Sequence, residues 1–129
     1  MVRHWRRGLG EKRKISREEL ARILEEHRRW LPSRGQVGGK ASLHNADLRR
    51  ANLRSARLSG ANFSDADLSH AYLSLANLYC THLSHANLLA ADLSSSNLIS
   101  TNLRTANIFR ADPRSANLSA ASLFCLSSS

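Results

Sequence analysis

No apolar run in this 129-residue chain approaches the length of a transmembrane helix, and the basic N-terminus lacks the apolar segment of a signal peptide. Cysteine is scarce, since Cys80 and Cys125 are the only two. Free thiols are typical of the cytosol. The sequence therefore predicts a cytoplasmic protein that has no internal disulfide and does not enter a membrane.

Signatures of catalysis and of metal binding are also missing. The chain has no H-E-x-x-H motif, no paired C-x-x-C and no glycine-rich phosphate loop, and Gly60 is an isolated glycine. Its many serines have no evident base beside them. We expect no enzyme, no cofactor and no metal. The alternative is a metal site in which His82 and His85 meet at a corner beside a carboxylate.

What the sequence does have is a five-residue repeat that runs in one register from Ala41 to Cys125. Seventeen pentads follow the pattern A-(D/N)-L-x-x, and the central Leu is replaced only by Phe63, Ile108 and Pro113. The residue two before the centre is Ala in all but three pentads. The residue between them is Asn or Asp in twelve.

A period of five suits neither a helix nor a long flat strand. In a helix the central residue of each pentad would be rotated by about 140° about the helix axis from that of the pentad before, so no apolar stripe would form. In a strand alternate pentads would point Leu to opposite faces, because five is odd. The pattern works if each pentad is a short extended piece followed by a corner. Ala and Leu then point inward together, and the chain winds into stacked coils.

These seventeen registered pentads resemble the pentapeptide-repeat proteins. The resemblance implies an all-β solenoid, the right-handed quadrilateral β-helix, with four pentads in each coil and about four coils. Residues twenty apart then stack in columns. The expected core centres of the first eight pentads are Leu43, Leu48, Leu53, Leu58, Phe63, Leu68, Leu73 and Leu78.

The same columns continue to the end of the repeat. We expect Ile108, Pro113 and Leu118 to occupy inner positions as well, with one inter-coil hydrogen bond lost at Pro113 because proline has no N–H. Outward positions twenty apart predict ladders of side chains. The two columns singled out are Asn62, His82, Asn102 and Asn77, Asn97, Asn117.

The residues before the repeat divide into a basic flexible arm (1–15) and a capping helix with its linker (16–40), ahead of the β-helix (41–126). Ser16 and Glu19 form a capping-box pattern at the start of a helix. An apolar stripe follows, made of Leu20, Ile23, Leu24, His27 and Leu31. Pro32 is expected to end the helix, which should cover the open edge of the first coil.

The net charge of +9 lies mostly in the N-terminal part. Residues 1–40 carry twelve Lys and Arg against five Glu, whereas the repeat carries seven Arg against five Asp. Arginines gather in the first coil at Arg49, Arg50, Arg54 and Arg57. With the basic arm they give one functional hypothesis, the binding of nucleic acid or another anionic surface.

Resemblance to the family suggests a second hypothesis, because some of its members mimic DNA and bind topoisomerases. That role requires a strongly negative rod. The repeat here is slightly basic, and no dimerising helix follows it. The sequence therefore does not favour DNA mimicry.

The hypothesis we favour is a scaffold that binds a protein partner of unknown identity. Leu89 and Phe109 stack in one outward column, and Tyr79 and Ile99 in another. Exposed apolar groups of this kind mark contact sites. They also suggest a weak homodimer through the apolar side face or through the C-terminal edge.

Overall fold

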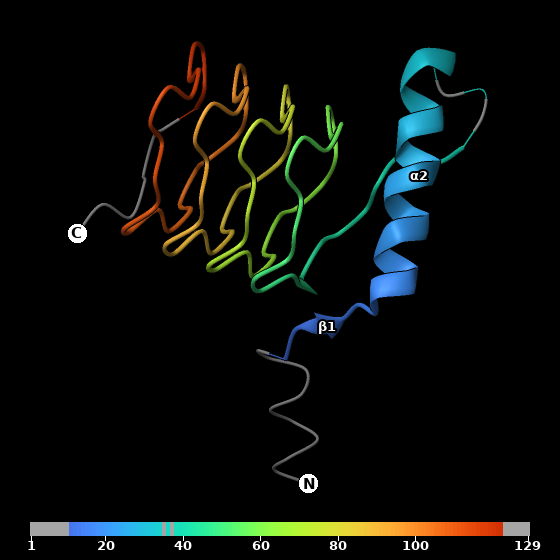
Figure 1. Ribbon diagram of the computed structural model, residues 1–129, viewed down its shortest axis with the longest axis horizontal. Helices are drawn as coiled ribbons and strands as arrows, with labels where there is room; N and C mark the ends of the chain where they lie inside the picture. Colours follow the sequence, from blue (N-terminus) through green and yellow to red (C-terminus); the bar gives the residue numbers. More distant parts are fainter. Residues whose placement is uncertain (1–10, 35, 37, 123–129) are drawn as a thin grey trace, which may run out of the picture.

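The computed structural model describes residues 11–34, 36 and 38–122. It contains the short strand β1 (Arg13–Lys14), the helix α2 (Arg17–Ser33) and the short strand β2 (Ala46–Asp47). Elsewhere the pentads alternate single bridging residues with turns. Figure 1 shows the pentads as a stack of similar turns, with α2 standing against one end and the last described pentads, coloured red, at the other.

Parallel bridges hold this stack together, and almost all of them join residues twenty apart. Ser42 bridges to Asn62, Asn62 to His82 and His82 to Asn102. Four pentads therefore separate one layer from the next, and we call such a twenty-residue layer a coil. The spacing is the one that the repeat predicts for four-sided winding.

Three N–H groups of each pentad that has a coil on both sides bond to a neighbouring coil. At the start of the repeat, Leu43 donates to the Asn62 carbonyl (2.7 Å) and Asn45 donates to the Ser64 carbonyl (2.9 Å). Asn62 donates back to the Ala41 carbonyl (3.0 Å). The same pattern recurs along the stack, so each inner coil is paired with the coils on both sides.

A fourth N–H closes the corner between pentads. The Ala46 N–H donates to the Leu43 carbonyl across a tight turn (3.1 Å), and equivalent bonds follow at each later corner. The last residue of every pentad from Asn45 to Ala120 has φ between 57° and 75°. Only Gly60 among them is free of the steric cost of this left-handed conformation, which is about 1 kcal/mol for other residues.

The fifth N–H explains why the pentad contains Asn or Asp. In all twelve pentads that have one, its Oδ1 accepts from the backbone N–H two residues later. Examples are Asn62 with Ser64 (2.9 Å) and Asp92 with Ser94 (3.0 Å). This Asx-type bond satisfies a donor that has no partner in the next coil.

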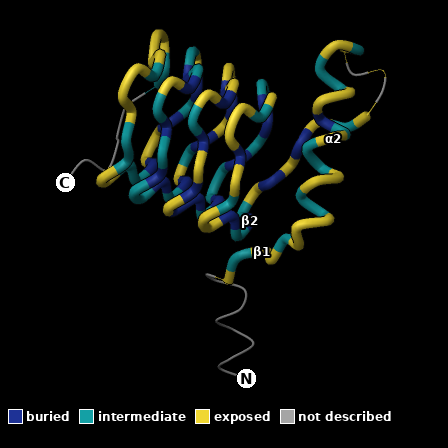
Figure 2. The backbone as a smooth tube through the Cα atoms, in the orientation of Figure 1, coloured by how far each residue is buried: buried dark blue, intermediate teal, exposed yellow. Residues whose placement is uncertain are grey.

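The core lies along the axis of the stack, where the buried residues of every coil meet (Figure 2). The eight centres expected there, from Leu43 to Leu78, are all at most 3% exposed. Where Ala is replaced, the buried hydroxyl donates to the carbonyl three residues earlier, as in Thr81 to Leu78 (2.8 Å). Ser96 and Thr101 do the same.

The end of the repeat departs from the expected columns. Ile108 is only half-buried, and Pro113 and Leu118 are exposed rather than internal. The reason is their position, since no later coil within residues 38–122 covers them. One expected ladder is present in part, with Asn97 donating to Asn77 (3.3 Å).

Helix α2 begins as its capping pattern predicts, since the Ser16 Oγ accepts from the Glu19 N–H (3.0 Å). Its end differs from the prediction. Pro32 lies inside the helix, which continues to Ser33 before Arg34 adopts the left-handed conformation. A proline in the last turn removes only its own N–H and can be accommodated there. Leu20, Ile23 and Leu24 pack against the core.

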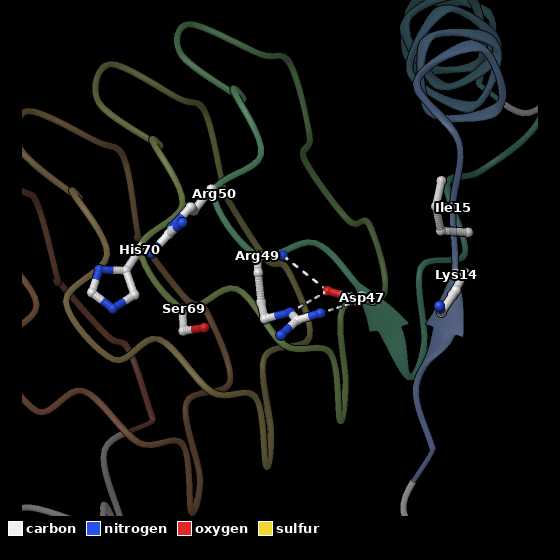
Figure 3. Close-up of a pocket in the computed structure, with 7 residues that line it drawn as sticks. All are labelled: Lys14, Ile15, Asp47, Arg49, Arg50, Ser69 and His70. Carbon is white, nitrogen blue, oxygen red and sulfur yellow. Dashed lines mark hydrogen bonds and ion pairs between the residues drawn. The ribbon is translucent and has the colours of Figure 1, made fainter. Parts of the chain in front are cut away.

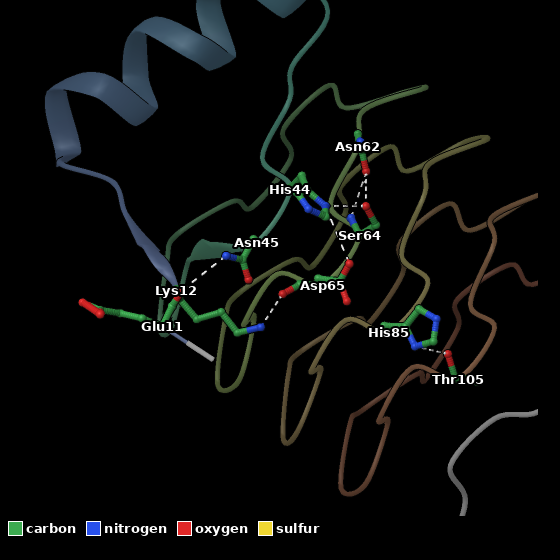
Figure 4. Close-up of polar contacts among 9 residues, drawn as sticks. All are labelled: Glu11, Lys12, His44, Asn45, Asn62, Ser64, Asp65, His85 and Thr105. Atoms are coloured by element: carbon green, nitrogen blue, oxygen red, sulfur yellow. Dashed lines mark hydrogen bonds and ion pairs between the residues drawn. The ribbon is translucent and has the colours of Figure 1, made fainter. Parts of the chain in front are cut away.

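The prediction that residues 1–15 form a flexible arm is wrong for residues 11–15. Strand β1 pairs in parallel with β2, with Arg13 opposite Ala46. The Arg13 guanidinium donates to the Ser42 carbonyl (2.9 Å), and the Lys12 Nζ donates to the Asp65 carbonyl (2.6 Å; Figure 4). An unpaired edge of the first coil attracts these residues. Residues 1–10 lie outside the described residues.

A buried histidine joins α2 to the first coil. His27 is 0% exposed, and its Nδ1 accepts from the Ala41 N–H (2.9 Å). Because Nδ1 accepts, the proton sits on Nε2, which donates to the Ser59 carbonyl (2.8 Å). Burial lowers the pKa of His27, and nearby Lys40 adds to this, against the opposing effect of the Ser59 bond. The ring is therefore held neutral.

The Asx-type bond should have a measurable free energy. Asn102→Ala removes the acceptor of the Arg104 N–H and should lower the free energy of unfolding by about 1 kcal/mol in urea denaturation. His82→Ala is the matched control, at the same position one coil earlier, and should change it by less than about 0.5 kcal/mol. Equal losses in both variants would contradict the assignment.

The neutral His27 should make stability depend on pH. Its pKa in the folded protein lies below the value of about 6.5 in the unfolded chain, which therefore binds the proton first. The free energy of unfolding should consequently fall as pH drops through about 6.5 and level off below the folded pKa. His27→Gln should flatten this profile between pH 7.5 and 5, and His70→Gln, at an exposed ring, is the control variant.

Candidate interaction site

A continuous groove runs between α2 and the first coil. One part is lined by Ile15, Leu20, Leu24, Leu48 and Ala51, with Arg17, Arg49 and Arg50 around them. The next part shares Ala21 and Leu24 and adds Glu25, Arg28, Ser55, Ala56 and Arg57. The groove thus has an apolar floor and basic sides, and we call it the edge groove.

The edge groove opens at one end onto the surface shown in Figure 3, which is lined by Lys14, Asp47, Arg49, Arg50, Ser69 and His70. Arg49 turns to Asp47 and donates to it twice, each bond 2.9 Å long. The hydrogen bond from Arg49 lowers the pKa of Asp47 and outweighs the effect of burial. Arg49 is therefore largely neutralised, whereas Arg50 has no ion-pair partner among the described residues.

Of the four arginines predicted to cluster, Arg49, Arg50 and Arg57 line the edge groove, and Arg49 is paired there with Asp47. Arg54 stacks on the Tyr72 ring, with its guanidinium carbon 4.2 Å from the ring centre.

The apolar columns also separate. Leu89 and Phe109 flank the bridge between Asn87 and Asn107, whereas Tyr79 and Ile99 flank the bridge between Asn77 and Asn97. The two columns are ten residues apart in a twenty-residue coil, so they lie on opposite sides of the stack. Phe109 is 47% exposed and Tyr79 45%, while Leu89 and Ile99 are half-buried.

Among residues 11–34, 36 and 38–122, the side chains of His27, His44 and His85 bond to hydroxyl or backbone groups. No group of three His, Cys, Asp or Glu side chains that could hold a metal occurs in the part of the chain that the structure describes. His85 bonds instead to the Thr105 hydroxyl (2.7 Å), and His44 to the Ser64 hydroxyl (2.9 Å; Figure 4). Likewise, none of the helices in the described ranges is long and apolar enough to span a membrane.

Sequence reasoning expected an open edge on the first coil but missed that its backbone stays partly unpaired beside the helix. The second residue of each pentad in this coil has no preceding coil to pair with. Other parts of the chain bond to some of these residues and not to others. Arg13 bonds the Ser42 carbonyl, β1 pairs at Asp47 and His27 bonds the Ser59 carbonyl. The backbone N–H and C=O groups of Asn52 and Arg57 have no partner within the described residues. These two positions border the edge groove.

A stack of pentads bridged at twenty-residue spacing defines a β-helical solenoid. The profile of the pentapeptide repeat family, built on eight copies, matches residues 41–78 and 76–112. The chain belongs to the pentapeptide repeat family.

Two solved structures are similar along most of the repeat. A pentapeptide repeat protein from Nostoc is 32% identical, with a TM-score of 0.66 over 80% of this chain and 74% of that one. A pentapeptide repeat protein from the thylakoid lumen of Arabidopsis thaliana is 28% identical, with a TM-score of 0.62 over 64% of this chain and 58% of that one. No curated protein matches the sequence.

Hydrogen exchange should reveal the open edge directly. The amides of Asn52 and Arg57 should exchange at least about 100-fold faster than those of Tyr72 and Asn77, which occupy the same columns one coil later. The later amides donate to the Ala51 and Ala56 carbonyls, both at 2.9 Å. Equal protection at all four positions would show that something covers the edge.

Proposed function

We propose that this protein is a non-catalytic scaffold that binds a protein partner through its outward side chains. The observation that carries the proposal is the exposure of Tyr72, Leu75, Tyr79 and Phe109 on a backbone whose hydrogen bonds are made within the stack. Side chains on such a lattice lose little further conformational freedom when a partner binds. Apolar groups in fixed positions are suited to contact rather than to chemistry.

The finer architecture belongs to the same proposal. We take the coils to be right-handed and four-sided, about four in number, with α2 and β1 acting together as the cap of the first coil. The twenty-residue bridges and the likeness to solved pentapeptide repeat proteins support this arrangement. A cap is expected because the first coil of a solenoid would otherwise expose its core.

Two side faces are candidates for the contact. Leu89 and Phe109 form one, where the Arg110 guanidinium carbon lies 5.3 Å from the Phe109 ring centre. Tyr79 and Ile99 form the other, next to the exposed Cys80. We propose weak self-association through the Phe109 face, with the exposed Leu118 end as the alternative contact.

Single substitutions should separate these faces. Phe109→Ser should abolish any rise of the sedimentation coefficient with concentration and leave the thermal midpoint within about 2 °C, because the side chain is outward. Tyr79→Ser is the matched variant on the opposite face. In a pull-down from the native lysate, at least one protein captured by the wild-type chain should be lost with one of the two variants and retained with the other. Unchanged sedimentation and capture in both variants would contradict the proposal.

A further inference from the structure

Strand β1 shows how the edge of the first coil accepts an added strand. Arg13 and Lys14 lie in parallel register with Ala46 and Asp47 and fill the edge on that side of the coil. The chain cannot continue to the next side, because Ser16 caps α2 immediately afterwards. The next equivalent edge, five residues along at Asn52, is therefore left open: this residue lines the edge groove, and its N–H and C=O have no partner within the described residues.

The floor of the edge groove beside Asn52 is apolar. Leu20, Leu24, Ala51 and Ala56 are half-buried there, so each side chain retains surface that another apolar group can cover. Helix α2 borders the groove from Arg17 to Arg28, about 16 Å at the helical rise of 1.5 Å per residue. That length matches about five residues of extended chain.

The sides of the groove are positively charged. Arg17, Arg50 and Arg57 line it and have no ion-pair partner among the described residues. The acidic groups nearby are already engaged, Asp47 by Arg49 and Glu25 by Arg28 (2.7 Å). An occupant would therefore be attracted if it carried carboxylates.

We propose that the edge groove binds an extended acidic segment of a partner protein, which adds as a strand at Asn52. In an extended chain alternate side chains point to opposite sides, so a pattern of alternating apolar and acidic residues fits. The apolar side chains contact Leu20 and Leu24, and the carboxylates pair with Arg17 and Arg50. The inference rests on the scaffold function proposed above and names the chemical class of its partner. The contact residues differ from those of the Phe109 and Tyr79 columns.

Charge argues against residues 1–10 as the occupant. Residues 1–10 carry Arg3, Arg6 and Arg7 and no acidic residue, so they would be repelled by the same arginines that attract an acidic strand. A nucleic acid would also be attracted by the arginines. It would make no strand-type bond to the Asn52 backbone, however, so amide exchange at Asn52 distinguishes a nucleic acid from a peptide strand.

The experiment uses the full chain and a fluorescein-labelled nonapeptide in which valine and glutamate alternate. Binding of the peptide is measured by fluorescence anisotropy. Saturable binding is expected, and Arg50→Glu and Arg57→Glu should each weaken it roughly tenfold. Arg110→Glu is the matched control, at the same pentad position three coils later, and should change the affinity less than about twofold. The peptide in which lysine replaces glutamate should not bind.

Amide exchange provides the second readout. The peptide should slow exchange at Asn52 at least about tenfold and leave Tyr72 unchanged. Absence of saturable binding overturns the proposal, and so does binding without protection of Asn52, or tighter binding of a single-stranded oligonucleotide than of the peptide. If the peptide fails while Phe109→Ser or Tyr79→Ser still abolishes capture of a partner, the groove proposal is wrong and the scaffold proposal stands.

Discussion

The structure depends on the hydrogen bonds between coils, which join backbone groups about twenty residues apart. Within a pentad that contains Asn or Asp and has a coil on both sides every N–H is used, as in residues 61–65: three between coils, one across the corner and one to the Asx side chain. Small Ala and branched Leu can then share a narrow axis, because the backbone and not a large core fixes their positions. The stack is stabilised layer by layer, as in other solenoids.

The sequence predicted what a local pattern can encode. The spacing of Ala and Leu gave the core positions, and Ser16 with Glu19 gave the start of α2. It did not predict β1, because Arg13 and Lys14 show no apolar alternation and pair with residues 33 positions later in the chain. That pairing results from an unfilled edge, which no local pattern describes. Domain boundaries remain a prediction.

The candidate site was harder to predict than the fold. Composition indicated basic residues in the first coil, yet the pairing of Arg49 with Asp47 and the stacking of Arg54 on Tyr72 depend on side-chain directions. The left-handed corners were also missed. Gly60 was a local sign of them, as was the rarity of β-branched residues at the last pentad position, where Thr105 is the exception.

The coil length has a consequence for how such a chain can change during evolution. Gain or loss of one pentad preserves the inward and outward pattern but rotates everything after it by a quarter turn relative to α2. Gain or loss of twenty residues leaves the azimuth of every later side chain unaltered. Variants that keep the Phe109 column aligned with the first coil should therefore differ in length by whole coils. The number of pentads thus sets the rotation of one end of the molecule relative to the other.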